Sequence, residues 1–164
     1  MAVARRYLIA LGSNQRHARY GGPRAVLGSA IAAMGSFGSV EAVSPIVDSA
    51  PLGPSRRRYV NAAVVLASGL EPAAMLSRLQ AIERGYGRVR RGQRWRARAL
   101  DLDLIMWSGG AWDGPGLIIP HREFRRREFV LAPAAAIAAR WRDPITKRTI
   151  AHLLARLTRP TPLP

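Results

Sequence analysis

The order of the apolar segments constrains the fold of this chain more strongly than any other feature of its sequence. Four short apolar or β-rich runs have the character of strands, and two stretches between them place apolar residues at the three- and four-residue spacing of an amphipathic helix. The strands are expected at 7–11, 40–47, 59–66 and 99–107, and the helices at 23–34 and 72–84. The resulting order, β-α-β-β-α-β, is typical of an α+β ferredoxin-like sandwich, in which helices cover one face of an antiparallel sheet.

The last third of the chain is expected to add to this core. Leu117–Ile119 has the character of a short extra strand, and residues 129–139 of a helix. A final amphipathic helix is expected at 150–157, with Thr149 as its N-cap. Because no repeat, linker or second domain is evident, the sequence predicts a single domain over residues 1–164, with C-terminal helices added to the sandwich.

The charge of the chain is strongly positive. It carries 26 basic and 10 acidic side chains, a formal charge of +16, and Lys147 is its only lysine. Such a field attracts polyanions, and arginine suits bidentate contacts with phosphate. A genome rich in G and C would also raise the arginine content, which offers a compositional explanation for surface positions such as Arg140, Arg142 and Arg156. Charge alone therefore leaves an ATP-using enzyme and an RNA-binding protein as alternatives.

Several classes of protein are disfavoured by what the sequence lacks. There is no cysteine for disulfides or for zinc, which fits a reducing cytoplasm. The apolar run after Arg5 and Arg6 stops at Gly12, so a first strand is expected there and not an export signal, and no apolar stretch has the length of a membrane span. Neither a Walker-type loop nor a Gly-x-Gly-x-x-Gly motif is present. We expect a cytoplasmic protein without a membrane partner.

Asp101 and Asp103 are the strongest local signal for chemistry. Because side chains alternate along a strand, both carboxylates are expected on one face near its beginning. The opposite face would hold Leu100, Leu102, Leu104 and Met106, and the aspartate face would continue with Ile105 and Trp107. Magnesium prefers one or two carboxylates together with water and phosphate oxygens, so the pair is a natural seat for it. The alternative is an ion pair with nearby arginines or a turn cap.

A basic loop precedes this strand, with Arg88, Arg90, Arg91, Arg94, Arg96 and Arg98. Guanidinium groups beside metal-held phosphates would supply the positioning and charge stabilisation that phosphoryl transfer requires; a solvated basic loop is the alternative. Glu83 lies within the apolar arc of the 72–84 helix and is expected to face the core, where a buried carboxylate needs a partner. Otherwise it emerges at the helix end and pairs with an arginine.

These residues and several short motifs resemble the hydroxymethyl-dihydropterin pyrophosphokinase family of folate synthesis along nearly the whole chain. Each motif is weak, but their shared order and spacing are highly specific. The motifs are Leu11-Gly12-Ser13-Asn14, Ser49-Ala50-Pro51-Leu52-Gly53-Pro54, Tyr59-Val60-Asn61-Ala62-Ala63-Val64, Gln80-Ala81-Ile82-Glu83, Gly87-Arg88, Arg94-Trp95, Arg98-Ala99-Leu100-Asp101-Leu102-Asp103, Pro120-His121 and Arg127-Glu128-Phe129-Val130-Leu131-Ala132-Pro133. The resemblance implies a ferredoxin-like monomer with extra strands that moves a diphosphate from ATP to a pterin alcohol and releases AMP.

The same resemblance implies roles for individual residues. Asp101 and Asp103 would bind two Mg²⁺ ions, and Asp101 is a candidate general base. Arg88 and Arg98 would close over the transferring diphosphate with the help of Arg90 and Trp95, and the nucleotide would contact Glu83, Leu104, His121 and Arg127. The pterin would stack between Tyr59 and Phe129, and its edge would be read by Asn61 and by Ser49, Pro51 and Leu52. Core packing is the alternative for the two aromatic residues.

The sequence departs from the family pattern at several positions. The departures are Arg96-Ala97 in place of a frequent Gly-Pro, the loss near Gly116 of a common arginine, Arg122 in place of an aromatic residue, and Ala50 and Ala99 in place of more usual residues. They affect expected substrate affinity more than reaction type. Arg122 and Arg125 are both candidates for the missing ATP contact.

The second function considered is RNA binding by a ferredoxin-like sheet with stacked aromatic residues. The glycine- and phenylalanine-rich strand pattern of such modules is missing, and the aromatic residues Tyr59, Trp95, Trp107 and Phe129 are scattered. Nucleic acid is therefore not the expected partner. A degenerate homologue acting as a scaffold is a third possibility, against which stand the retained aspartates, arginines and His121.

Overall fold

The computed structural model describes residues 3–50, 57–87 and 99–162. Its main sheet contains β1 (Arg5–Ser13), β2 (Ser39–Val43), β3 (Val47–Ser49), β4 (Tyr59–Ser68) and β5 (Asp101–Trp107). The strand order is β2-β4-β1-β5, with β3 also paired to β4, and every pairing is antiparallel. With α1 (Pro23–Met34) and α2 (Pro72–Gly85) between the strands, this is the predicted ferredoxin-like arrangement.

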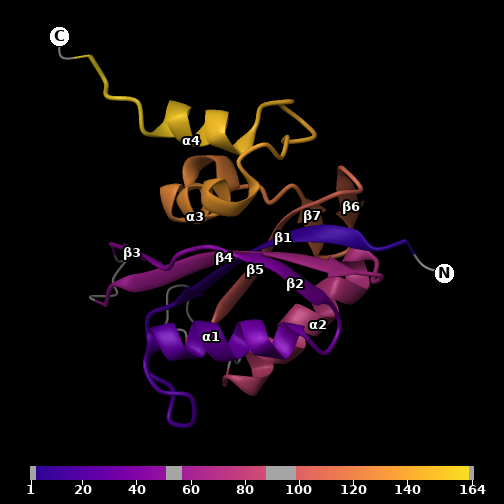
Figure 1. Cartoon of the computed structure of the whole chain (residues 1–164), viewed down its shortest axis with the longest axis vertical. Coiled ribbons are helices and arrows are strands. Elements are labelled where there is room, and N and C mark those ends of the chain that lie inside the picture. Colours follow the sequence, from indigo (N-terminus) through magenta and orange to yellow (C-terminus); the bar gives the residue numbers. More distant parts are fainter. Residues whose placement is uncertain (1–2, 51–56, 88–98, 163–164) are drawn as a thin grey trace.

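Helices cover both faces of the sheet (Figure 1). The first two helices lie on one face, and α3 (Glu128–Ala138) and α4 (Ile150–Leu157) lie on the other. The predicted C-terminal helices are thus confirmed, and the Thr149 hydroxyl caps α4 by accepting a hydrogen bond of 3.2 Å from the His152 N–H. No helix in the described segments has both the length and the apolar character needed to cross a membrane.

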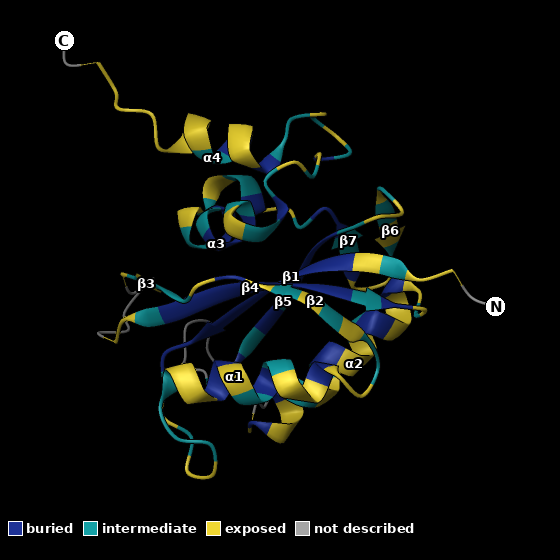
Figure 2. Ribbon diagram, in the orientation of Figure 1, coloured by how far each residue is buried: buried dark blue, intermediate teal, exposed yellow. Residues whose placement is uncertain are grey.

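The sheet separates two hydrophobic cores, and much of its central strands is buried (Figure 2). In β1, the side chains of Tyr7, Ile9 and Leu11 pack toward α1 and α2, while Leu8 and Ala10 pack toward α3 and α4. Strands buried on both faces have apolar residues at nearly every position, which explains the continuous apolar runs in the sequence. The sheet is therefore the middle layer of the molecule, with a layer of helices packed on each face.

The expected strand at 40–47 is wrong as a single element, because it is broken into β2 and β3. Val43 pairs with Val64 and Val47 with Asn61, so three residues of this segment oppose two of β4. Pro45 sits in the break and has no N–H to donate to a ladder. Ser44 holds the break in place, since its hydroxyl accepts a hydrogen bond from the Ala63 N–H at 2.8 Å. Ser49 ends β3.

A bulge in β5 changes the predicted alternation of its side chains. Leu8 pairs with Met106 but Ile9 pairs with Leu104, so Ile105 is an extra residue. Ile105 lies on the aspartate face as expected, but Met106 joins it in the core under α3, and Trp107 moves to the opposite core. The expectations for Met106 and Trp107 were therefore wrong, because the bulge resets the period-two pattern.

A small hairpin follows the main sheet. It consists of β6 (Trp112–Gly114), which the sequence did not predict, and β7 (Leu117–Ile119), which it did. Gly116 in the turn has φ +70°, a conformation that favours glycine. A cis peptide bond joins Ile119 to Pro120, and the short 3₁₀ helix η1 (Phe124–Arg126) leads into α3.

Candidate active site

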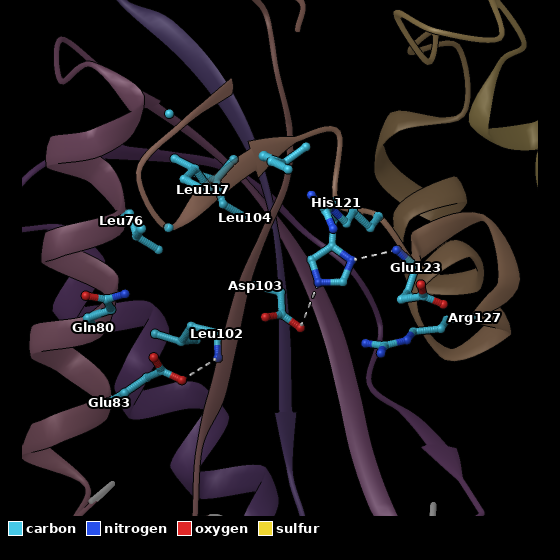
Figure 3. A pocket seen from close by; sticks show the side chains of 14 residues that line it. Leu76, Gln80, Glu83, Leu102, Asp103, Leu104, Leu117, His121, Glu123 and Arg127 are labelled. Atoms are coloured by element: carbon cyan, nitrogen blue, oxygen red, sulfur yellow. Dashed lines mark hydrogen bonds and ion pairs between the residues drawn. The ribbon is translucent and has the colours of Figure 1, made fainter. Parts of the chain in front are cut away.

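A cleft of about 660 Å³ lies beside the edge strand β5 (Figure 3). One wall is α2, the opposite wall is the segment from His121 to Arg127, and the β6–β7 hairpin closes one end. Leu104, the residue expected to contact the nucleotide, is buried in the floor together with Leu117. The cleft thus combines an apolar floor with charged and polar walls, as small-molecule sites commonly do.

Asp103 faces this cleft from the middle of β5, and Asp101 lies two residues earlier on the same face. Both belong to the edge of the sheet, because β5 is the last strand in the order of the described sheet and pairs there with β1. The Asp103 side chain is 44% exposed, so its carboxylate oxygens can reach an ion or a ligand. The prediction that the two acids share one accessible face is confirmed by the register of the strands.

Glu83 connects α2 to this edge strand. Its side chain is only 3% exposed, and Oε2 accepts a hydrogen bond of 3.2 Å from the Leu102 N–H, between the two aspartates. An edge strand presents N–H groups that no neighbouring strand satisfies, and this carboxylate satisfies one of them. Glu83 therefore faces the core side, as predicted, and it also lines the cleft.

Two further residues of α2 line the cleft, Leu76 and Gln80, and neither was assigned a role from the sequence. Their spacing to Glu83 is seven and three residues, which puts all three on one side of the helix. This spacing was the available signal, because a helix that contributes one cleft residue contributes the residues one and two turns away as well.

His121 stands opposite Asp103, with 4.0 Å between Nε2 and Oδ2. Its backbone N–H donates to the Ile105 carbonyl at 2.9 Å, which ties this wall of the cleft to β5. Nδ1 accepts a hydrogen bond from the Glu123 N–H at 3.2 Å, so the neutral ring carries its proton on Nε2 and points it at Asp103. Burial lowers the pKa of His121, with Asp103 and Glu123 opposing this effect and Arg127 adding to it.

Arg127 and Phe129 stand at the beginning of α3. The Arg127 guanidinium lies 5.8 Å from the centre of the Phe129 ring, a cation–π contact, and it reaches the cleft. Phe129 is half-buried at the border of the second core. Because α3 packs against β4 and β3, this residue lies on the same face of the sheet as the aspartates.

The expected pterin-edge residues form a second group on that face. Asn61 is 5% exposed, and its Nδ2 donates a hydrogen bond of 2.7 Å to the Ser49 hydroxyl. Ser49 pairs in the sheet with Tyr59, which brings all three residues together at one end of β4. None of the three lines the 660 Å³ cleft. They lie on the same face of the sheet as the aspartates. Gly12 of β1 connects the two groups, because it pairs with Asn61 on one side and with Asp101 on the other.

The structure therefore brings together Glu83, Asp103, Leu104, His121 and Arg127 around one cleft. Asp101, Asn61, Ser49, Tyr59 and Phe129 lie on the adjoining part of the same face of the sheet. The remaining candidates lie outside the described residues, namely Arg88, Arg90, Trp95, Arg98, Pro51 and Leu52.

Comparison with known proteins agrees with this arrangement. The family model described as 7,8-dihydro-6-hydroxymethylpterin-pyrophosphokinase (HPPK) matches residues 8–139. A Pseudomonas aeruginosa protein named 2-amino-4-hydroxy-6-hydroxymethyldihydropteridine pyrophosphokinase is 39% identical over 156 residues, which are 93% of this chain and 92% of the relative. A Synechocystis protein of the same name is 39% identical over 118 residues, or 72% of this chain and 60% of the relative.

Solved structures support the fold. The crystal structure of wild-type Plasmodium falciparum HPPK-DHPS superposes with a TM-score of 0.74 at 11% identity, over 94% of this chain and 45% of that chain. At such low identity the likeness concerns the fold alone. With the family match covering most of the chain and identities near 40%, this chain belongs to the 7,8-dihydro-6-hydroxymethylpterin-pyrophosphokinase (HPPK) family.

Proposed function

We propose that this chain transfers a diphosphate from ATP to the hydroxymethyl group of 6-hydroxymethyl-7,8-dihydropterin, with Mg²⁺, in folate biosynthesis. The observation that carries the proposal is the position of Asp103 and His121 across a cleft with an apolar floor, next to Asp101 on the same strand face. The names of the relatives, which are pyrophosphokinases of this pterin, support it.

The donor set fits magnesium. Asp101 and Asp103 offer hard carboxylate oxygens from one strand face, which is what this ion takes from a protein when substrate phosphates and water complete its octahedron. Within the described residues no group of three or more His, Asp or Glu side chains could hold a metal by itself, so a shared site with the nucleotide suits this pair. When bound, Mg²⁺ would neutralise phosphate charge and lower the pKa of the pterin alcohol.

The reaction would proceed by attack of the hydroxymethyl oxygen on the β-phosphorus of ATP. The new O–P bond forms as the bond from the β-phosphorus to the α,β-bridging oxygen breaks, so AMP leaves with that oxygen. The proton of the alcohol passes to a base, for which Asp101 is the candidate. His121 would donate its Nε2 proton as a hydrogen bond to a phosphate oxygen, and Arg127 would add positive charge beside it. Arg88 and Arg98, with Arg90 and Trp95, are proposed to act on the transferring diphosphate by family resemblance alone.

The pterin would lie on the sheet face near β3 and β4. Asn61 offers both a donor and an acceptor, and its orientation is fixed by Ser49. Tyr59 and Phe129 are proposed to stack on the two sides of the ring, a favourable arrangement for a flat bicyclic system. Leu104 would pack against the adenine from the cleft floor.

RNA binding has less support. Ferredoxin-like RNA-binding modules stack bases on an open sheet face. In the described part of this chain, one face is covered by α1 and α2 and the other by α3 and α4. A basic surface remains, but without a stacking platform it predicts only weak, salt-sensitive attraction.

The deciding experiment measures AMP release from Mg-ATP with and without the reduced hydroxymethylpterin, followed by mass detection of the pterin diphosphate. Product that requires both the pterin and Mg²⁺ establishes the activity. A folded protein that forms no product and binds neither ATP nor the pterin in calorimetry would refute the proposal.

A further inference from the structure

The wall of the cleft between His121 and Arg127 contains arginines at positions 122, 125, 126 and 127, and the structure gives them different surroundings. Arg122 and Arg127 line the cleft, whereas Arg125 and Arg126 do not. The sequence alone does not show which of these four arginines reach the cleft. The way their segment packs against the sheet decides it.

Arg125 is fully engaged elsewhere. Its Nε lies 2.6 Å from Asp143 Oδ2 and its Nη2 lies 2.8 Å from Oδ1, a bidentate pair with a carboxylate that is completely buried. A guanidinium in such a pair cannot turn toward a ligand without leaving a buried charge unpaired. Arg125, one of the two candidates for the missing ATP contact, is therefore a structural residue.

Arg122 is in the opposite situation. Its side chain is exposed, and within the described segments its guanidinium has no hydrogen bond or ion pair. The backbone is nevertheless fixed on both sides of it, by the His121 N–H bound to the Ile105 carbonyl and by the completely buried Phe124. This guanidinium is available to an anion, because no existing hydrogen bond or ion pair has to break before it can bind one.

The charges of the cleft show what such an anion would gain. Glu83, Asp103 and Glu123 bring carboxylates to its lining. Among the described lining residues, Arg122 and Arg127 are the cations. A nucleoside triphosphate placed beside Asp103 therefore depends on these two guanidinium groups for direct positive charge from the described walls.

We propose that Arg122 is a substrate-binding residue of this chain, which holds a phosphate of ATP from the wall opposite α2 and takes the place of the aromatic residue expected after His121. The proposal rests on the proposed function, because it assumes that ATP occupies the cleft. It adds the identity of a contact in which this chain departs from the family pattern, and it predicts that the contact is directed at the phosphates and not at the base.

The test is calorimetric binding of Mg²⁺ with α,β-methylene ATP, which cannot transfer its diphosphate, and of adenosine, to the wild type and to Arg122→Ala. Loss of a charge-assisted hydrogen bond should weaken the ATP analogue about 10-fold or more. Adenosine, which has no phosphate, should bind the two proteins equally. Arg122→Lys should keep part of the affinity, since it retains the charge without the bidentate fork.

Arg126→Ala is the matched control, because it removes the same charge from the same segment at an exposed position outside the cleft. Equal ATP-analogue affinities of Arg122→Ala and Arg126→Ala would overturn the role of Arg122, and so would an equal loss for adenosine. If either of these results is found and the wild type still forms product from Mg-ATP and the pterin, only the role of Arg122 is refuted. If the wild type binds no ATP at all, the proposed function fails with it.

Discussion

Asn61 and Asp101 lie in one row across the sheet, with Gly12 as the residue between them. Asn61 belongs to the proposed pterin site and Asp101 to the proposed metal site. The hydroxymethyl group of a bound pterin would therefore extend over Gly12 toward Asp101. A glycine leaves the floor of that passage without a side chain. A Cβ at Gly12 would stand 3.3 Å from Asn61 Oδ1 and 4.0 Å from Tyr59 Cδ1.

The first prediction concerns this glycine. Gly12→Ala should leave the free energy of unfolding unchanged or raise it by up to about 1 kcal/mol, because alanine is preferred to glycine inside a strand. It should nevertheless lower kcat/KM for the pterin roughly 3- to 10-fold, because Asn61 must give way and its hydrogen bonding is disturbed. Thermal unfolding and steady-state kinetics measure the two effects. Gly28→Ala is the control, since a Cβ there meets nothing within 4 Å; equal kinetics for both variants would contradict the prediction.

The second prediction tests the carboxylates. Asp101→Ala and Asp103→Ala should each lower turnover by about 100-fold or more, through loss of a metal ligand. Neither should unfold the protein, because both side chains lie at the sheet edge outside the two cores. Rates are to be measured across a Mg²⁺ titration, with Asp113→Asn on β6 as an exposed control outside the cleft. Normal activity in either alanine variant would remove that residue from the metal site.

The third prediction concerns Glu83 as the group that positions β5. Glu83→Leu should leave the Leu102 N–H without its acceptor and cost about 1–3 kcal/mol of stability. It should also raise the Mg²⁺ concentration needed for half-maximal rate, because the strand that bears both aspartates is less well held. Glu83→Gln keeps an oxygen that can accept from Leu102 and should retain more of both properties. If the two variants have the same stability and the same Mg²⁺ dependence, this hydrogen bond does not position the strand.

The fourth prediction concerns the buried Arg125–Asp143 pair. Burial alone would raise the pKa of Asp143, but hydrogen bonds from Arg125, Thr146 and the Ile145 N–H lower it to about 2. A carboxyl with a depressed pKa in the folded state adds stability above its unfolded pKa, near 4, and this stability is lost as the pH falls toward 2. Between pH 4 and 2 the wild type should therefore lose more stability than Asp143→Asn.

Arg125→Ala tests the same pair at neutral pH. Removing one partner of a buried ion pair leaves the other charge uncompensated, and we expect a loss of about 3 kcal/mol in the free energy of unfolding. Denaturant unfolding measures it, with Arg126→Ala as the control. Equal stability of the two arginine variants would show that the Asp143 carboxylate does not depend on Arg125.

The sequence predicted the central fold well for a physical reason. Strands such as β1 and β4 are buried on both faces, so their apolar runs are unbroken, and α1 and α2 keep a regular apolar stripe. The break between β2 and β3 could also have been anticipated, because Pro45 cannot donate to a ladder. What escaped prediction was β6, a three-residue strand that pairs with β7.

The site was predictable only where local spacing decides it. Alternation placed Asp101 and Asp103 on one face, and helical spacing turned Glu83 inward. The partner of Glu83 lies 19 residues away at Leu102, and the bulge at Ile105 depends on the pairing with β1. The difference between Arg122 and Arg125 depends on a buried carboxylate 18 residues beyond Arg125. Such relationships arise from tertiary contacts that no local pattern records.

The bulge at Ile105 makes the distance between His121 and Asp103 independent of the length of the hairpin that precedes His121. Its carbonyl receives the His121 N–H, so the separation between His121 and Asp103 is set within a few residues of β5 and not by the chain that connects them. That chain contains the β6–β7 hairpin, whose turn near Gly116 lies at the far end of both strands. A change in the length of this turn should therefore reshape the end of the cleft without moving the Asp103 carboxylate relative to the His121 imidazole.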